Sequence, residues 1–280
     1  PNQILLSLKK QLNQKQLVTD KTNQAYQRDF GQLGMAFGDN LDDVEWMDVY
    51  KKLVYWELEI EKTVDQSMEE VLSMQKQEAN AEFTKFIKEN YTEWLSKNAD
   101  YTPTMSNTLM DNYVFPELGD KPVFFFVIDN LRFDQWKVLE PEISQYFNID
   151  TEEMYYSILP TATGYARNSI FSGLMPDEMA GQHSDIWVDD TDEEGQNMHE
   201  EEFLIRQLKS KGHDIKSSYH KILRQDQGKD VLAKMSNLSN NDLNVLVYNF
   251  VDMLSHARTD SKMIRELAPD EAAYRSVTKS

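Results

Sequence analysis

The sequence predicts an all-α N-terminal part, built as a three-helix bundle, followed by a layered α/β domain. Three observations lead to this fold class. Apolar residues recur at helical spacing up to about Leu95, a turn-rich stretch follows, and apolar runs typical of strands then alternate with helical patterns. The 280 residues, 40% of them hydrophobic, suffice for about two domains with substantial cores.

Three amphipathic stripes predict the helical bundle over residues 13–98. Steps of three and four residues place each stripe on one face of a helix. The stripes are Tyr26, Phe30, Leu33 and Phe37; Trp46, Val49, Leu53, Trp56 and Ile60; and Phe83, Ile87, Tyr91 and Trp94. Further apolar residues extend the second stripe and predict one long helix: Val64, Met68, Val71 and Leu72.

The remaining residues divide into three parts. Residues 1–12 form a short amphipathic piece, which we interpret as the end of a preceding domain. Residues 99–121 are rich in turn-forming residues and predict a linker. Residues 122–280 then form the α/β domain. Its predicted strands are Val123–Ile128, buried on both faces, Met154–Leu159, Asp214–Tyr219 and Asn244–Val251; its helices lie near Trp136–Tyr146, Thr163–Ile170 and Glu201–Lys209.

Composition excludes several function classes. The 29 basic and 48 acidic residues give a net charge of −19, which disfavours direct DNA binding. The absence of cysteine excludes disulfides, thiolate nucleophiles and cysteine-bound zinc. The longest apolar run is too short for a membrane span, and no signal peptide is visible, so we expect a cytoplasmic protein.

One segment is unusually acidic. Between Asp177 and Glu202 there are eleven acidic residues and no Lys or Arg. Blocks of like charge are usually exposed, which favours a solvated insertion loop. A lid or an interaction surface is the alternative.

Candidate catalytic groups follow the predicted strands. Asp129 ends the first strand, Thr163 begins the helix after the second, and Asp252 ends the last, with His256 four residues later. Open α/β sheets bind ligands at the carboxyl ends of their strands. Carboxylate, imidazole and hydroxyl groups suit a divalent cation, while a helix N-terminus and Arg167 suit a phosphate. An ordinary helix cap is the alternative for each acid. The candidate cation ligands, the threonine hydroxyl and Arg167 together favour phosphoryl or sulfuryl transfer.

Four motifs carry a family resemblance. They are Val127-Ile128-Asp129-Asn130, Leu159-Pro160-Thr161-Ala162-Thr163, Phe171-Ser172-Gly173-Leu174 and Asp252–His256. They resemble the alkaline-phosphatase superfamily and, more narrowly, its PglZ branch. Nucleotide pyrophosphatase/phosphodiesterase relatives likewise place a Pro-Thr-x-Thr segment ahead of a Thr-Gly-Leu or Ser-Gly-Leu.

The resemblance implies an alkaline-phosphatase-like fold and assigns roles to individual residues. Thr163 matches the nucleophile, with Thr161 as the alternative. Asp129 and Thr163 match the groups that share one metal ion, and Asp252 and His256 match ligands of the other; these ions are usually zinc. Arg167 or Asn168 would orient the phosphate.

The helical half followed by a PglZ-like domain resembles the PorX type of response regulator, which is linked to type IX secretion. This implies a sensor histidine kinase acting on a receiver domain, a homodimer, and contact with a transcription or sigma factor. Residues 1–12 would end the receiver domain. Residues 257–280 contain neither the superfamily's Asp-His-Gly motif nor any histidine, so we expect a chain that lacks the receiver domain and the C-terminal part of the PglZ domain.

Three functions therefore compete. The first is a metal-dependent phosphodiesterase or phosphatase, with a nucleotide phosphodiester as substrate. The second is a non-catalytic signalling module that dimerises and binds a transcription factor. The third is an inert scaffold, in which the strand-end residues are only helix caps.

Overall fold

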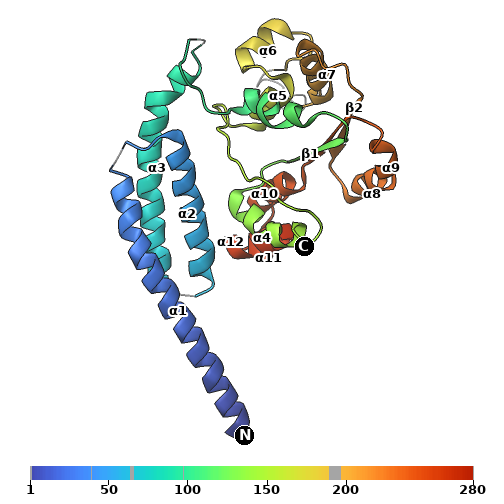
Figure 1. Cartoon of the computed structure of the whole chain (residues 1–280). Coiled ribbons are helices and arrows are strands. Elements are labelled where there is room, and N and C mark those ends of the chain that lie inside the picture. Colours follow the sequence, from blue (N-terminus) through green and yellow to red (C-terminus); the bar gives the residue numbers. More distant parts are fainter. Residues whose placement is uncertain (1, 39, 64–65, 97, 189–196, 280) are drawn as a thin grey trace. The chain divides into compact units, whose positions relative to one another are not determined.

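The computed structural model describes residues 2–38, 40–63, 66–96, 98–188 and 197–279, which form two compact units (Figure 1). The helical unit contains the residues up to Thr102 together with Phe133–Phe147. The α/β unit contains Pro103–Arg132 and Asn148–Thr278. None of the helices in these described ranges combines the length and the apolar character needed to cross a lipid bilayer.

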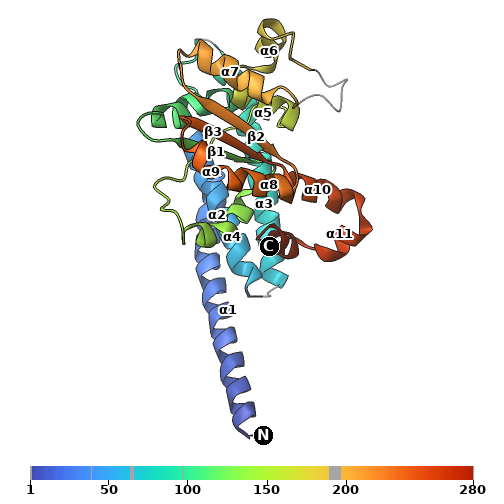
Figure 2. The same ribbon diagram turned by 90° about the vertical axis from the view of Figure 1, so that its right-hand side faces the viewer.

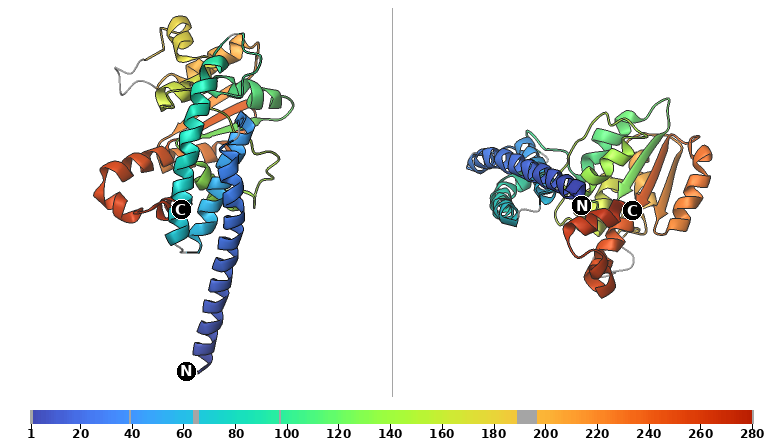
Figure 3. Two further views of the ribbon diagram at one scale, coloured as in Figure 1. Left: turned by 90° about the vertical axis from the view of Figure 1, so that its left-hand side faces the viewer. Right: turned by 90° about the horizontal axis from the view of Figure 1, so that it is seen from below.

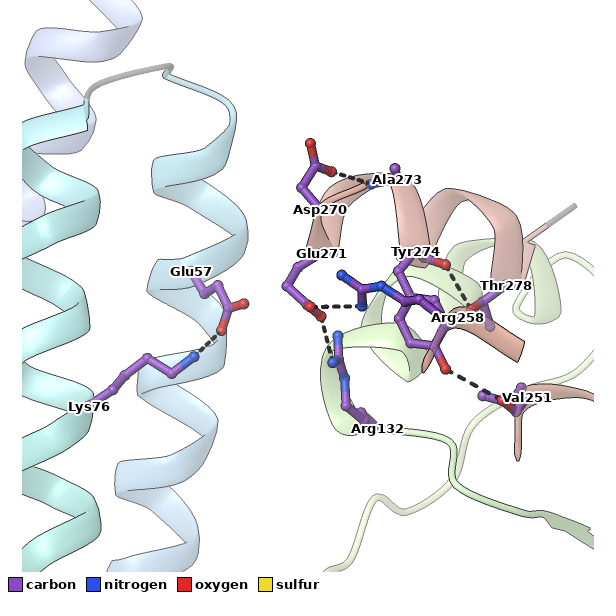
Figure 4. A network of polar contacts seen from close by, with 10 residues as sticks. All are labelled: Glu57, Lys76, Arg132, Val251, Arg258, Asp270, Glu271, Ala273, Tyr274 and Thr278. Carbon is purple, nitrogen blue, oxygen red and sulfur yellow. Dashed lines mark hydrogen bonds and ion pairs between the residues drawn. The ribbon is translucent and has the colours of Figure 1, made fainter. Parts of the chain in front are cut away.

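The helical unit confirms the predicted three-helix bundle. Its helices are α1 (Asn2–Ala36), α2 (Asp43–Glu61) and α3 (Gln66–Trp94). The first half of α1 extends beyond the other two helices (Figure 3), and the shared core begins at Tyr26. The first two predicted stripes and the extension of the second supply most of the core: Tyr26, Leu33, Phe37, Trp46, Val49, Leu53, Trp56, Ile60, Met68, Leu72 and Ala79. Of the third stripe, Phe83 packs against this core partly buried, whereas Phe30 of the first stripe is 40% exposed. An ion pair of 2.6 Å between Lys76 Nζ and Glu57 Oε2 also joins α3 to α2 (Figure 4).

Helix boundaries differ from the sequence prediction at two places. Helix α1 runs without interruption across residue 12. The prediction of one long helix through the second stripe is wrong, because α2 ends at Glu61 and a separate helix begins at Gln66. Val64 lies outside the described residues. An apolar stripe keeps its period when the chain reverses between two helices, so periodicity alone did not reveal the break.

A parallel three-stranded sheet forms the centre of the α/β unit (Figure 2). The strands β1 (Val123–Ile128), β2 (Ser217–Ile222) and β3 (Leu243–Tyr248) are arranged in the order β1-β3-β2. Within the described residues β1 pairs on one side only, and Phe126 is 51% exposed. The prediction that β1 is buried on both faces is therefore wrong, and β3 is the buried central strand.

Helices cover both faces of the sheet. On one face α5 (Thr163–Ser172), α6 (Pro176–Gln182) and α7 (Glu200–Ser210) bury a large apolar core against β3. On the other face α8 (Gln225–Ala233) and α9 (Met235–Leu238) cover a smaller core. The chain then continues through α10 (Phe250–Asp260), α11 (Lys262–Leu267) and α12 (Glu271–Lys279). These layers are consistent with an alkaline-phosphatase-like α/β fold.

The turn-rich stretch is more ordered than a linker. It forms 3-10 and π-helical turns at Ser106–Thr108, Met110–Val114 and Phe115–Glu117. The side chains of Met110 and Val114 belong to the large core of the α/β unit. Apolar residues between the turn formers thus attach residues from Pro103 onward to that unit.

Further elements deviate from prediction. Strand β2 begins three residues later than the strand predicted at Asp214–Tyr219, and β3 ends at Tyr248, so Asp252 lies in α10 and does not end the strand predicted at Asn244–Val251. Met154–Leu159 is not a strand: Tyr156 makes only an isolated bridge to Met105. The helix expected near Trp136–Tyr146 is α4 (Phe133–Ile143), which groups with the helical unit. The ring of Phe133 lies 6.0 Å from the ring of Tyr50 on α2. A short run of mostly apolar residues was an insufficient signal for a strand, since a ladder also requires a neighbouring strand.

Candidate active site

The parallel register brings two predicted site segments together. Ile128 pairs with Tyr248, and the backbone N–H of Asp129 donates to the carbonyl of Tyr248 at 2.9 Å. The chain then turns at Asn130, whose φ of 59° lies in the left-handed region that asparagine tolerates. Asp252 lies in the first turn of α10, which begins two residues after β3.

A buried ion-pair network surrounds Asp129. Arg167 on α5 donates from Nη1 to Asp129 Oδ2 at 2.6 Å, and its Nε binds Glu200 Oε1 at the start of α7. Glu200 Oε2 accepts from the hydroxyl of Tyr219 at 2.5 Å, and Lys221 Nζ lies 3.4 Å away. The side chains of Arg167 and Glu200 are only 4% and 1% exposed. One buried cation therefore serves two carboxylates.

The electrostatics confirm that these groups influence one another. Burial raises the pKa of Asp129; the charge of Arg167 opposes this rise, and the charges of Asp252 and Glu200 add to it. Burial and the charge of Asp129 likewise raise the pKa of Tyr155. The negative charge of Asp252 therefore opposes ionisation of Asp129, and a bound cation would offset this effect.

Thr163 is the first residue of α5. Arg167 follows it four positions later, so both lie on one face of the helix, one turn apart. The helix ends at Gly173, whose φ of 69° is left-handed and whose Cα approaches Gln207 of α7 so closely that a Cβ would lie 2.5 Å from Nε2. Thr163 is thus on the helix whose Arg167 binds Asp129.

Asp252 and His256 form a pair on α10. His256 Nε2 lies 3.6 Å from Asp252 Oδ1, and the imidazole is 76% exposed. Among the residues that the structure describes, no three His, Asp or Glu side chains gather as a ready cation site. The predicted donors nevertheless have the chemistry that a divalent cation requires. Asp129 and Thr163 offer oxygen atoms, and Asp252 with His256 offers oxygen and nitrogen.

The contacts of Arg167 and Asn168 bear on their predicted role in orienting phosphate. Arg167 already binds two carboxylates. Asn168 is fully buried and donates from Nδ2 to the carbonyl of Gly164 at 2.8 Å. The geometry favours Arg167 as the residue that holds Asp129 in place, and a phosphate contact by either residue stays a prediction.

Sequence reasoning missed Glu200 and Tyr219. Glu200 belongs to the acidic segment 177–202, for which an exposed loop was expected, yet its carboxylate is buried. Part of that segment, residues 189–196, lies outside the described residues. No local signal marks Glu200, because Arg167, its partner, is 33 residues away in the chain.

Asp129→Asn is expected to remove a pH-dependent loss of stability. The pKa of Asp129 is raised above 3.8 in the folded protein, so the folded state keeps a proton that the unfolded state has lost. The free energy of unfolding of the wild type should therefore fall as the pH rises from the unfolded-state pKa of Asp129 to its higher folded-state pKa. The free energy of unfolding of the variant should not fall in this pH range. Urea midpoints measured in the presence of EDTA, from about pH 4 upward, report the difference.

A second substitution tests the cause of that shift. Asp252→Asn removes a charge that raises the pKa of Asp129, so the folded-state pKa of Asp129 should move down toward its unfolded value. The pH range over which stability falls should then be narrower. If the stability of the wild type and of Asp129→Asn changed in parallel with pH, the raised pKa of Asp129 and with it both predictions would be contradicted.

Comparison with known proteins supports the order of the two units. Residues 16–95 match the PorX response regulator linker domain, and residues 109–279 match the BREX system PglZ alkaline phosphatase-like domain. A comparison with individually curated proteins gave no match. The second match covers more than half of the chain, and the first precedes it in the arrangement of a PorX-type PglZ protein. The chain belongs to the PglZ alkaline phosphatase-like family.

Proposed function

We propose that this protein is a metal-dependent phosphodiesterase or phosphatase that serves as a PorX-like effector. One observation carries the proposal: Arg167, on the helix that begins with Thr163, binds Asp129 at the end of β1. The charge of Asp252 also raises the pKa of Asp129. These groups gather at the carboxyl end of a parallel sheet, where α/β enzymes bind their ligands. The substrate is a nucleotide-type phosphodiester.

Thr163 is the nucleophile, and Thr161 remains the alternative. The Oγ1 atom loses its proton and forms a bond to phosphorus while the bond from phosphorus to one ester oxygen breaks and that alcohol leaves. Water later hydrolyses the resulting threonine phosphodiester and releases a phosphomonoester. The backbone N–H groups at the start of α5 donate to the phosphate oxygens.

Four residues hold two divalent ions, expected to be zinc: Asp129 with Thr163, and Asp252 with His256. When bound, such ions promote loss of the hydroxyl proton and offset charge on the phosphoryl oxygens. Arg167 keeps Asp129 oriented, and Glu200 and Tyr219 keep Arg167 in place.

Hydrolysis of bis(p-nitrophenyl) phosphate, a chromogenic phosphodiester, tests this function. We expect turnover that EDTA abolishes and Zn²⁺ restores, while p-nitrophenyl phosphate distinguishes a phosphodiesterase from a phosphatase. Turnover that a chelator leaves unchanged would remove the metal from the mechanism. Absence of turnover at every metal concentration would reject the enzyme.

A signalling module without catalysis is the second candidate. The match of residues 16–95 to a response regulator linker favours it, because a helical connector suits rigid-body coupling between domains. Its setting is cytoplasmic two-component control of type IX secretion, with a sensor histidine kinase upstream, a homodimer as the active form and a transcription or sigma factor as the target. Phosphorylation-dependent dimerisation without turnover would support this candidate over the enzyme.

A further inference from the structure

Helix α12 is capped at its start, and its first turn contacts other segments of the α/β unit. The carboxylate of Asp270 accepts from the N–H of Ala273 at 2.8 Å, which caps the helix (Figure 4). Glu271 follows in the first turn, where the helix dipole favours a negative charge. The cap thus stabilises the turn of α12 from which the Glu271 side chain extends.

Glu271 joins the two segments that carry the candidate metal ligands. Its Oε2 lies 2.5 Å from Arg132 Nη1, and its Oε1 accepts from Arg258 Nη1 at 2.9 Å (Figure 4). Arg132 follows Asp129 by three residues, and Arg258 follows His256 by two. Each oxygen of one carboxylate therefore holds one side of the site.

Tyr274 adds a second connection. Its ring lies beneath both guanidinium groups, with Cζ of Arg132 5.3 Å and Cζ of Arg258 5.0 Å from the ring centroid. Its hydroxyl donates to the carbonyl of Val251 at 3.4 Å, directly before Asp252 in the chain. Tyr274 is 3% exposed, so this packing is well defined.

These contacts begin where the sheet ends. The hydrogen bond from Asp129 N to Tyr248 O is the last one described between β1 and β3. Beyond it, the segments that follow the two strands leave the sheet. Glu271 and Tyr274 connect the two segments again at Arg132, Val251 and Arg258. The carboxylate of Glu271 contacts both arginines at once, and the buried Tyr274 ring packs against both, so the two segments are connected through one helix.

We propose that Glu271 and Tyr274, the α12 clamp, are positioning residues that set the distance between Asp129 and the Asp252–His256 pair. The effect of the clamp on zinc affinity and hydrolysis rests on the proposed function. Its effect on the distance between the two segments does not.

The absence of cysteine allows a direct test of that distance. Spin labels on Phe126→Cys of β1 and Met253→Cys of α10, both at exposed positions, report how far α10 lies from the sheet. We expect one narrow distance distribution in the otherwise unchanged protein, and a broadened or shifted one when Glu271→Ala or Tyr274→Leu is added. Glu271→Gln, which keeps the shape of the side chain, should broaden it less and provides a folded variant if alanine disrupts α12.

Glu266→Gln is the matched control. Glu266 lies on the neighbouring helix, is 68% exposed, and its carboxylate is 3.9 Å from Lys262 Nζ. This variant should leave the distance unchanged. Zinc affinity, measured by competition with a chromogenic chelator, should fall about tenfold or more in Glu271→Ala and stay at the wild-type value in Glu266→Gln.

Distances that are identical in the wild type, Glu271→Gln and Glu271→Ala would overturn the clamp. A broadened distribution in a protein that neither binds zinc nor hydrolyses a phosphodiester would uphold the clamp and reject the proposed function. The two failures are therefore distinguishable.

Discussion

Thr163→Val is expected to lower the rate of phosphodiester hydrolysis by about 10⁴-fold or more, because valine has the shape of threonine without a hydroxyl to attack phosphorus. The fold should survive, since Thr163 is the first residue of α5 and the large core is formed by later residues of the helix, including Ile170 and Phe171. Steady-state turnover and thermal unfolding of the same preparation would separate lost chemistry from lost structure.

Thr161→Val is the matched control. Thr161 is exposed and precedes α5, so the substitution deletes the same atom two residues away. We expect this variant to keep most of its activity. If Thr161→Val were inactive and Thr163→Val active, the nucleophile would be Thr161.

Arg167→Ala should be the most destabilising single change near the site. It leaves the carboxylates of Asp129 and Glu200 without the buried cation that both bind. Removing one partner from a buried ion pair typically costs about 3–5 kcal/mol, because the remaining charge stays desolvated. Arg167→Lys should lose less but still be impaired, since an ammonium group lacks the planar fork that reaches both acids. Urea denaturation measures the loss.

Arg206→Ala provides a control with the same chemistry at the surface. Arg206 binds Asp185 through two hydrogen bonds, of 2.8 and 2.6 Å, and Glu202 through a third. Water solvates these carboxylates once the arginine is removed, so the expected loss of stability is far smaller. Equal losses for the two variants would show that the Arg167 network contributes no more than a surface ion pair.

Periodicity predicted most of the helical unit and part of the sheet. Trp46, Leu53 and Ile60 lie in the core as their spacing indicates, and the apolar run Val123–Ile128 is a strand. Both are local signals, since a helix face and a strand are visible within one segment. The strand expected at Met154–Leu159 failed because pairing depends on a neighbour elsewhere in the chain.

The candidate site shows the same division. Asp129 and Asp252 were identifiable as acids that follow apolar strands, and the register of β1 against β3 brings their segments together. Glu200 was not identifiable, because nothing in the acidic segment distinguishes this residue, whose carboxylate is buried. The clamp formed by Glu271 and Tyr274 was equally invisible, since it joins segments more than 100 residues apart.

The sequence by itself determined the order of the two units, the families they match and the residue types available for chemistry, because these depend on composition, period and local motif. Tertiary structure alone decided which acid shares Arg167 with Asp129, which strand is central, and how Asp252 reaches the end of β1. Burial and long-range pairing make that selection: a charge becomes part of the site only where the folded chain withdraws it from water and supplies a partner.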